Sequence, residues 1–93
     1  MIKVLIYEDD LPFRETLSIL VSGTDGYELK GAYENCNQVS DHLVKFKPDV
    51  VLMDINMPGI GGLEGLRIVR GTAPETQVLM FTVFDDNENI FQA

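Results

Sequence analysis

The sequence predicts an α/β fold built on a doubly wound parallel sheet, with helices on both faces. Three observations lead to this class. Short apolar runs alternate with segments of helical periodicity, the runs are separated by enough residues for crossover helices, and acidic residues follow the first and third runs directly. The 93 residues leave room for one hydrophobic core, so we expect a single domain.

The first half of the chain predicts strand, helix, strand. Residues 2–7, IKVLIY, are nearly all apolar, which is typical of a central strand covered on both faces. Asp10 as N-cap, Pro12 in the first turn and Gly23 as a stop signal bound a first helix. Residues 27–33, YELKGAY, alternate and predict an edge strand, with one side formed by Tyr27, Leu29, Gly31 and Tyr33.

The second half repeats the alternation of helix and strand. Residues 49–53, DVVLM, predict a third, buried strand, and MPGIGG at 57–62 predicts a loop because proline and glycine interrupt strands. Residues 77–83, QVLMFTV, predict a fourth strand after a turn at Pro74, and 85–93 predict the start of a helix. Apolar residues at helical spacing predict two further helices: Val39, Leu43 and Phe46 before Pro48, then Leu63, Leu66 and Val69 or Arg70.

The composition excludes some classes of partner. With 15 acidic and 7 basic residues the net charge is −8, which disfavours direct binding to nucleic acid or an anionic membrane. Cys36 is the only cysteine, so no internal disulfide can form, in keeping with a reducing compartment. The N-terminal apolar run is too short for a signal peptide or a membrane span. We therefore expect a cytoplasmic protein without a membrane partner.

Polar side chains stand at the carboxyl ends of three predicted strands. Glu8 and Asp9 follow the first strand, Asp54 follows the third, and Thr82 lies near the end of the fourth. Neighbouring strands lie about 4.8 Å apart, so these side chains can converge on one site. Clustered carboxylates repel each other unless a cation lies between them, and Mg²⁺ prefers such oxygen ligands. A carboxylate can also attack phosphorus, with Thr82 donating a hydrogen bond to a phosphoryl oxygen.

Each of these residues also has a simpler interpretation when it is taken alone. Asp9 or Asp10 is typical of a helix cap, Asp54 of a residue that starts a loop, and Thr82 of an ordinary strand. Their coincidence at three strand ends favours a shared site. His42, the only histidine, lies among polar residues of the second predicted helix, which predicts a solvated surface position.

The residues resemble the receiver domains of two-component response regulators over nearly the whole chain. The resemblance is carried by the apolar strand followed by EDD, by Thr82 in VLMFTVFDD, and by the pattern within DINMPGIGG: Asp54, Met57, Pro58 and Gly62. It implies a flavodoxin-like topology with strand order 2-1-3-4-5.

The resemblance also implies a role for each site residue. Asp54 would be the phospho-acceptor and Asp9 the main Mg²⁺ ligand, with Glu8 nearby, through water, and the backbone carbonyl of Asn56 as a further ligand. Thr82 would be the switch hydroxyl that moves toward the phosphoryl group. The donor would be a phosphohistidine on a partner histidine kinase or phosphotransfer protein. Such a domain is a signalling switch that assists its own phosphorylation and dephosphorylation, not an enzyme with a diffusible product.

The resemblance stops before the family pattern is complete. A receiver continues through the fourth helix, a fifth strand and a fifth helix, with a lysine at the end of the fifth strand that pairs with the phosphoryl group. We therefore expect residues 1–93 to be a partial receiver domain whose open sheet edge makes it self-associate or unfold. The lysines present all precede Asp54 and do not replace the missing one: Lys3, Lys30, Lys45 and Lys47.

Two other functions remain open at this point. One is a pseudo-receiver that serves only as a protein-interaction module. The other is a Mg²⁺-dependent phosphohydrolase on a similar fold, which needs a second carboxylate two residues after the first, where this chain has Asn56. Contact with DNA is expected only through an output domain absent here, and a homodimer is left open.

Overall fold

The structure is a computed structural model that describes residues 1–81, and it contains a four-stranded parallel sheet of order β2-β1-β3-β4. This order confirms the predicted fold class. Thr82 and the predicted helix start at 85–93 lie outside the described residues. The elements are β1 Ile2–Tyr7, α1 Leu11–Ser22, β2 Tyr27–Tyr33, α2 Val39–Phe46, β3 Val50–Asp54, α3 Gly62–Thr72 and β4 Gln77–Phe81.

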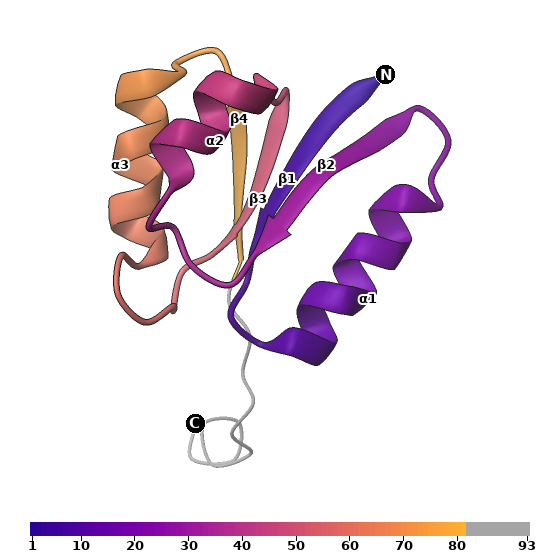
Figure 1. Ribbon diagram of the computed structural model, residues 1–93, viewed down its shortest axis with the longest axis horizontal. Helices are drawn as coiled ribbons and strands as arrows, with labels where there is room; N and C mark the ends of the chain where they lie inside the picture. The colour runs from indigo at the N-terminus through magenta and orange to yellow at the C-terminus, as the bar shows by residue number, and fades with distance from the viewer. Residues whose placement is uncertain (82–93) are drawn as a thin grey trace.

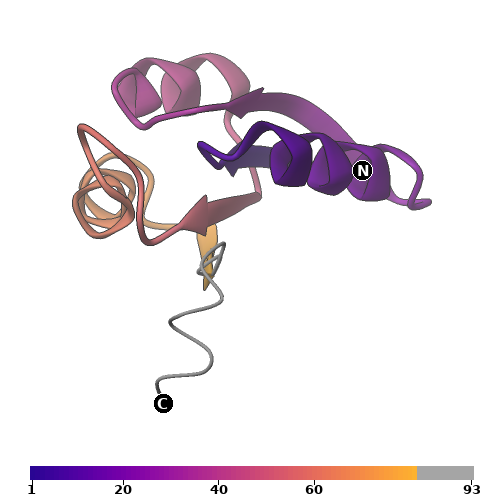
Figure 2. The ribbon, with the colours of Figure 1, turned by 90° about the horizontal axis from the view of Figure 1, so that it is seen from below.

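The helices lie on both faces of the sheet, as a doubly wound fold requires. Helix α1 packs on one face against β1 and β2, and helices α2 and α3 pack together on the other (Figures 1 and 2). The chain order reverses between β1 and β3, so the loops that follow these two strands diverge. A binding crevice is expected at that point, at the carboxyl ends of the strands.

The predicted bounds of α1 are confirmed by its capping contacts. The Asp10 carboxylate accepts a hydrogen bond from the Phe13 N–H at 3.1 Å, and Pro12 lies in the first turn. At the other end the Gly23 N–H donates to the Ile19 carbonyl at 2.9 Å. No helix within residues 1–81 has the length and apolar character needed to span a bilayer.

Strand β2 is an edge strand among the described strands, but its predicted alternation is wrong. Val4 pairs with Leu29 whereas Leu5 pairs with Gly31, so Lys30 is an extra residue in a β-bulge. Consecutive residues of β1 point to opposite faces, and their partners therefore do so as well. Tyr27 and Leu29 consequently face α1, while Gly31 and Tyr33 face α2.

The main core lies between the sheet and helices α2 and α3. Its buried residues come from alternate positions of β1 and β3 and from the inner faces of the two helices: Leu5, Tyr7, Val51, Met53, Val39, Leu43 and Val69. Val4 and Ile6 are also buried, on the α1 side. The central strands are thus covered on both faces, as their apolar sequences predict.

Helix α3 approaches the sheet through glycines and not through its first leucine. The predicted helix is confirmed, but it begins at Gly62, which the sequence placed in the loop, and its apolar Leu63 is 66% exposed. A Cβ added to Gly65 would lie 2.8 Å from Cys36 Sγ and 2.9 Å from Met53 Sδ. The helix therefore packs too closely for a side chain at this position.

His42 is buried, so its predicted solvated surface position is wrong. Only 9% of the residue is exposed, and its Nδ1 is hydrogen-bonded to the Tyr7 hydroxyl at 2.8 Å. Its ring stacks on Tyr33 with centroids 3.8 Å apart. His42 lies three residues after Val39 and next to Leu43, on the inward face of α2. Burial lowers the pKa of His42, although Asp41 opposes this shift.

The lowered pKa of His42 predicts a dependence of stability on pH. Below about pH 6.5 the unfolded chain binds a proton at this histidine before the folded chain does, so stability falls. A His42→Gln variant lacks this titration, and its Tm should approach that of the wild type, or exceed it, as pH falls from about 7.5 to 5.5. Thermal denaturation across this range checks the effect. A Tm difference that is independent of pH would contradict it.

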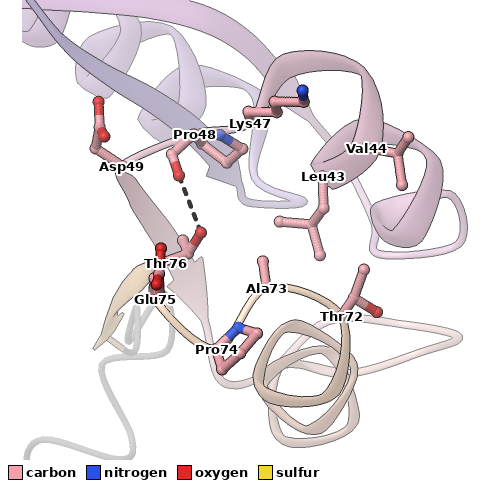
Figure 3. Close-up of a pocket in the computed structure, with 10 residues that line it drawn as sticks. All are labelled: Leu43, Val44, Lys47, Pro48, Asp49, Thr72, Ala73, Pro74, Glu75 and Thr76. Carbon is pink, nitrogen blue, oxygen red and sulfur yellow. Dashed lines mark hydrogen bonds between the residues drawn. The ribbon is translucent and has the colours of Figure 1, made fainter.

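A groove of about 540 Å³ lies at the amino-terminal end of the sheet, between the ends of α2 and α3 and the starts of β3 and β4 (Figure 3). Among its lining residues, the buried Thr76 hydroxyl donates to the Pro48 carbonyl at 2.9 Å. This groove is far along the strands from the acidic residues that follow β1 and β3, so it is not part of the candidate site.

Candidate metal centre at the carboxyl ends of the strands

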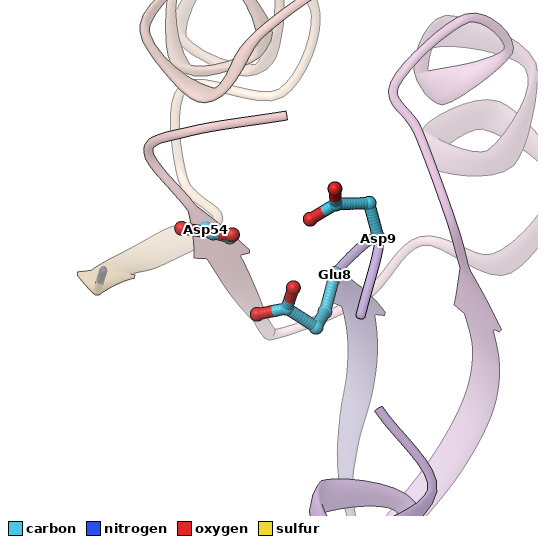
Figure 4. Close-up of side chains that lie close together, drawn as sticks. All are labelled: Glu8, Asp9 and Asp54. Atoms are coloured by element: carbon cyan, nitrogen blue, oxygen red, sulfur yellow. The ribbon is translucent and has the colours of Figure 1, made fainter. Parts of the chain in front are cut away.

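Three carboxylates meet where β1 and β3 end. Glu8 and Asp9 follow β1 directly, and Asp54 is the last residue of β3. Tyr7 pairs with Met53 in the sheet, so the next residue of each strand is Glu8 on one side and Asp54 on the other. One carboxylate oxygen from each of the three residues lies within 4.8 Å of the others (Figure 4). The structure therefore brings these three predicted site residues together.

Glu8 is fully buried within this cluster. Its N–H donates to the Tyr33 carbonyl at 2.9 Å, and its Oε2 accepts a hydrogen bond from the Asp10 N–H at 2.9 Å. Its Oε1 is buried and has no hydrogen-bond partner within residues 1–81. Burial raises the pKa of Glu8 to about 7, with further contributions from Asp9 and Asp54 and an opposing one from the Asp10 N–H.

Asp54 is also buried, with 2% of the residue exposed, whereas Asp9 is exposed. The Asp54 Oδ1 accepts a hydrogen bond from the Asn56 N–H at 3.1 Å. This contact fixes the orientation of the carboxylate. The cluster thus combines two buried carboxylates with one at the solvent boundary, which gives a ligand access from the Asp9 side.

The loop after Asp54 is held close to the strand by Gly62. The Gly62 N–H donates to the Ile55 carbonyl at 3.1 Å, and the Ile55 N–H donates to the Phe81 carbonyl at 2.7 Å. A Cβ on Gly62 would collide with the Asp54 carbonyl oxygen and lie 2.7 Å from the Ile55 Cα. Glycine is therefore required here for the backbone to pass so near the candidate site.

Arg14 contacts this site, although the sequence analysis did not single it out. Its Nη1 donates to the backbone carbonyl of Glu8 at 2.6 Å. Arg14 also belongs to the first turn of α1, where its N–H donates to the Asp10 carbonyl at 2.8 Å. A basic residue one turn into the helix that follows an acidic loop is the sequence signal that would have indicated it.

The donor set fits a hard divalent cation such as Mg²⁺. The buried Glu8 Oε1 has no hydrogen-bond partner among the described groups, and burial beside Asp9 and Asp54 disfavours the charged form of this carboxylate unless a cation is present. Carboxylate oxygens at this spacing are the ligands that Mg²⁺ takes in proteins, together with waters and phosphate oxygens. The same geometry offers a buried carboxylate next to the position that a phosphate would share with the ion.

Comparison with known proteins points to one family. Residues 4–93 match the family model described as the response regulator receiver domain. The chain is 36% identical over 87 residues to the response regulator GacA of Pseudomonas syringae pv. syringae strain B728a, covering 94% of this chain and 41% of that protein. It is 33% identical over 93 residues to the transcriptional regulatory protein LnrK of Bacillus subtilis strain 168, covering 100% and 42%. It thus spans about two fifths of the length of these relatives.

Solved structures agree with this assignment. The response regulator domain of Thermotoga maritima CheB superposes with a TM-score of 0.82 at 27% identity, covering 92% of this chain and 63% of that one. The chemotaxis protein CheY4 of Vibrio cholerae superposes with a TM-score of 0.79 at 29% identity, covering 99% and 77%. Strand order, acidic cluster and sequence match all agree, and the chain belongs to the response regulator receiver domains, a family of phospho-accepting signalling domains of two-component systems.

Proposed function

We propose that this domain is a phosphorylation switch in which Asp54 takes a phosphoryl group from a partner histidine kinase or phosphotransfer protein in a Mg²⁺-dependent reaction. The observation that carries the proposal is the meeting of Asp54 with Glu8 and Asp9 within 4.8 Å at the carboxyl ends of β1 and β3. Asp9, Asp54 and the backbone carbonyl of Asn56 would hold the ion, with Glu8 acting through water.

In this proposal Asp54 is the nucleophile. The Asp54 Oδ1 accepts the Asn56 N–H, so we assign the other carboxylate oxygen the new bond to phosphorus. The bond between phosphorus and the donor's imidazole nitrogen breaks in the same displacement, and the imidazole leaves. When bound, Mg²⁺ supplies the positive charge that phosphoryl transfer needs between the carboxylates and the phosphoryl oxygens. Arg14 and Asp10 keep Glu8 in place through its backbone carbonyl and its Oε2.

Thr82 completes the proposed switch. It follows Phe81 directly in the chain, and Phe81 pairs with Asp54 in the sheet. We assign its hydroxyl the role of donor to a phosphoryl oxygen, which couples an added charge of about −1.5 to −2 to the end of β4. This coupling changes the interaction surface of the domain without any diffusible product.

We also propose that residues 1–93 are a partial receiver domain, which a further strand and helix complete along β4. Within residues 1–81, β4 pairs only with β3, and its Leu79 is 61% exposed. On the same face a groove of about 350 Å³ runs beside α1, lined by Leu17, Leu20, Val21, Thr24, Tyr27 and Leu52. An unpaired strand and an apolar groove on one face support a strand and a covering helix at this edge.

The output of the switch belongs to the rest of the protein. LnrK is described as a transcriptional regulatory protein, and this chain spans 42% of its length. We propose a comparable arrangement here, in which the receiver controls a separate output domain that contacts DNA. The net charge of −8 argues that the receiver itself makes no such contact.

Phosphate incorporation tests the proposed function. The full-length protein, incubated with acetyl phosphate and Mg²⁺, is expected to gain one phosphate by intact mass, and peptide mapping after reductive trapping of the acyl phosphate should locate it at Asp54. Chelation of Mg²⁺ with EDTA should stop the reaction, because the clustered carboxylates then repel the phosphodonor. An unchanged mass in the presence of Mg²⁺ would contradict the proposal.

A further inference from the structure

A buried pair of polar side chains links helix α2 to the strand that carries Glu8. Tyr7 precedes Glu8 in the chain and is fully buried, and its hydroxyl is hydrogen-bonded to Nδ1 of His42 at 2.8 Å. The proposed phosphorylation switch uses neither residue. A tyrosine and a histidine that are both removed from water and bonded to each other therefore need another explanation.

Tyr33 contacts Tyr7, His42 and Glu8 at the same time. Its aromatic ring stacks on His42 with an interplanar angle of 16°, and its centroid lies 5.7 Å from that of Tyr7. Its backbone carbonyl accepts the Glu8 N–H at 2.9 Å. The Tyr33 ring occupies the space beside Gly31, where an added Cβ would lie 2.5 Å from the Tyr33 hydroxyl oxygen. Helix α2 is thereby connected to both strands next to the acidic cluster.

The direction of the Glu8 side chain is coupled to that of Tyr7. Side chains of consecutive residues in an extended chain point to opposite faces, so a twist of the backbone that turned Glu8 away from the cluster would carry Tyr7 out of its buried position. The Glu8 Oε1 is buried without a partner, beside Asp9 and Asp54, and this position of the carboxylate is therefore unfavourable without a cation. The bond between Tyr7 and His42 opposes that twist from the far side of the sheet.

We propose that Tyr7 and His42 are a positioning pair that keeps the Glu8 carboxylate aimed at the cation site and couples helix α2 to that site. This inference rests on the proposed function, since it takes the acidic cluster to be the Mg²⁺ site. Neither residue contacts the ion or the phosphoryl group. Both act through the backbone of Glu8, so their loss weakens the binding of Mg²⁺ without removing a ligand.

Calorimetric titration of the full-length protein with Mg²⁺ tests the pair. Tyr7→Phe keeps the buried ring and removes only the hydroxyl, and it is expected to raise the Kd for Mg²⁺ about tenfold, the smaller end of the range known for groups that orient metal ligands. Tyr33→Phe is the matched control, because it also loses one hydroxyl but keeps the stacked ring and the carbonyl that accepts from Glu8. Its Kd should stay at the wild-type value.

NMR spectra measure the coupling between the Mg²⁺ site and helix α2 directly. The His42 ring resonances in NMR spectra should shift when Mg²⁺ is added to the wild type and should remain fixed in Tyr7→Phe. If Tyr7→Phe does not fold, two His42 variants test the same hydrogen bond. His42→Gln retains a group that can bond to the Tyr7 hydroxyl and should bind Mg²⁺ more tightly than His42→Phe, which retains none.

The outcomes separate this inference from the proposed function. Wild-type protein that binds Mg²⁺ with the same Kd as Tyr7→Phe, or His42→Gln and His42→Phe proteins that bind equally, would overturn the positioning pair and leave the switch intact. Wild-type protein that does not bind Mg²⁺ would overturn both. A raised Kd for Mg²⁺ in Tyr7→Phe, together with an unchanged Kd in Tyr33→Phe, supports the positioning pair.

Discussion

The Asp54→Asn variant is expected to lose phosphate incorporation from acetyl phosphate by more than about 10³-fold, the scale on which removal of a nucleophile acts. An amide has no anionic oxygen to attack phosphorus, yet its Oδ1 can still accept the Asn56 N–H that the structure places at 3.1 Å from Asp54. The local turn should therefore survive while the chemistry is lost. Intact mass spectrometry after incubation with Mg²⁺ and acetyl phosphate measures the effect.

A folded Asp54→Asn protein can be recognised by its stability. Because Asp54 contributes to the raised pKa of Glu8, removing its charge lowers that pKa and relieves repulsion. Without metal, the Tm at neutral pH should therefore be equal to or above that of the wild type. Asp25→Asn is the matched control, since Asp25 is an exposed acid in the turn between α1 and β2 and its removal should leave phosphate incorporation unchanged. Undiminished labelling of Asp54→Asn would assign the phosphate to another residue.

The Gly62→Ala variant is expected to lose about 3 kcal/mol of folding stability, at the high end for an added methyl group in a packed site. The new Cβ would meet the Asp54 carbonyl oxygen and the Ile55 Cα, which are backbone atoms and cannot rotate away. The loop must shift, and with it the residue that carries the candidate nucleophile. Chemical denaturation gives the free energy of unfolding, and Mg²⁺ affinity should fall in the same variant.

Gly71→Ala is the matched control for this substitution. Gly71 lies in the last turn of the same helix, and nothing lies within 4 Å of the position that its Cβ would occupy. Alanine should therefore stabilise this position by about 0.5–1 kcal/mol through helix propensity alone. If the two alanine variants had equal stabilities, the close approach of helix α3 to Asp54 would not constrain the fold.

The order of elements and the meeting of the three carboxylates could be predicted because both follow from general rules. Parallel strands place their carboxyl ends at one edge, so acidic residues after the first and third apolar runs had to come close if those strands were neighbours. The caps of α1 were predictable for a similar reason, since Asp10 and Gly23 act through contacts within a few residues.

The parts that could not be predicted depend on contacts between distant segments. His42 looked solvated because its sequence neighbours are charged, but the helical period turns it toward Tyr7 and Tyr33, which come from other strands. The close approach of α3 to the sheet depends on Gly62 and Gly65, whose effect appears only once the helix is packed against β3. Arg14 was missed because its partner is a backbone carbonyl, so only its place one turn after the acidic loop could have indicated it.

The bulge at Lys30 decides which layer the second half of β2 joins. Tyr27 and Leu29 before the bulge face α1, whereas Gly31 and Tyr33 after it face α2. Deleting Lys30 would remove the bulge and leave Gly31 and Tyr33 opposite Leu5 and Tyr7, whereas the present sequence paired without a bulge would turn Tyr33 toward α1. A homologous chain that is one residue shorter in this segment could therefore keep its last tyrosine in the α2 layer without any bulge.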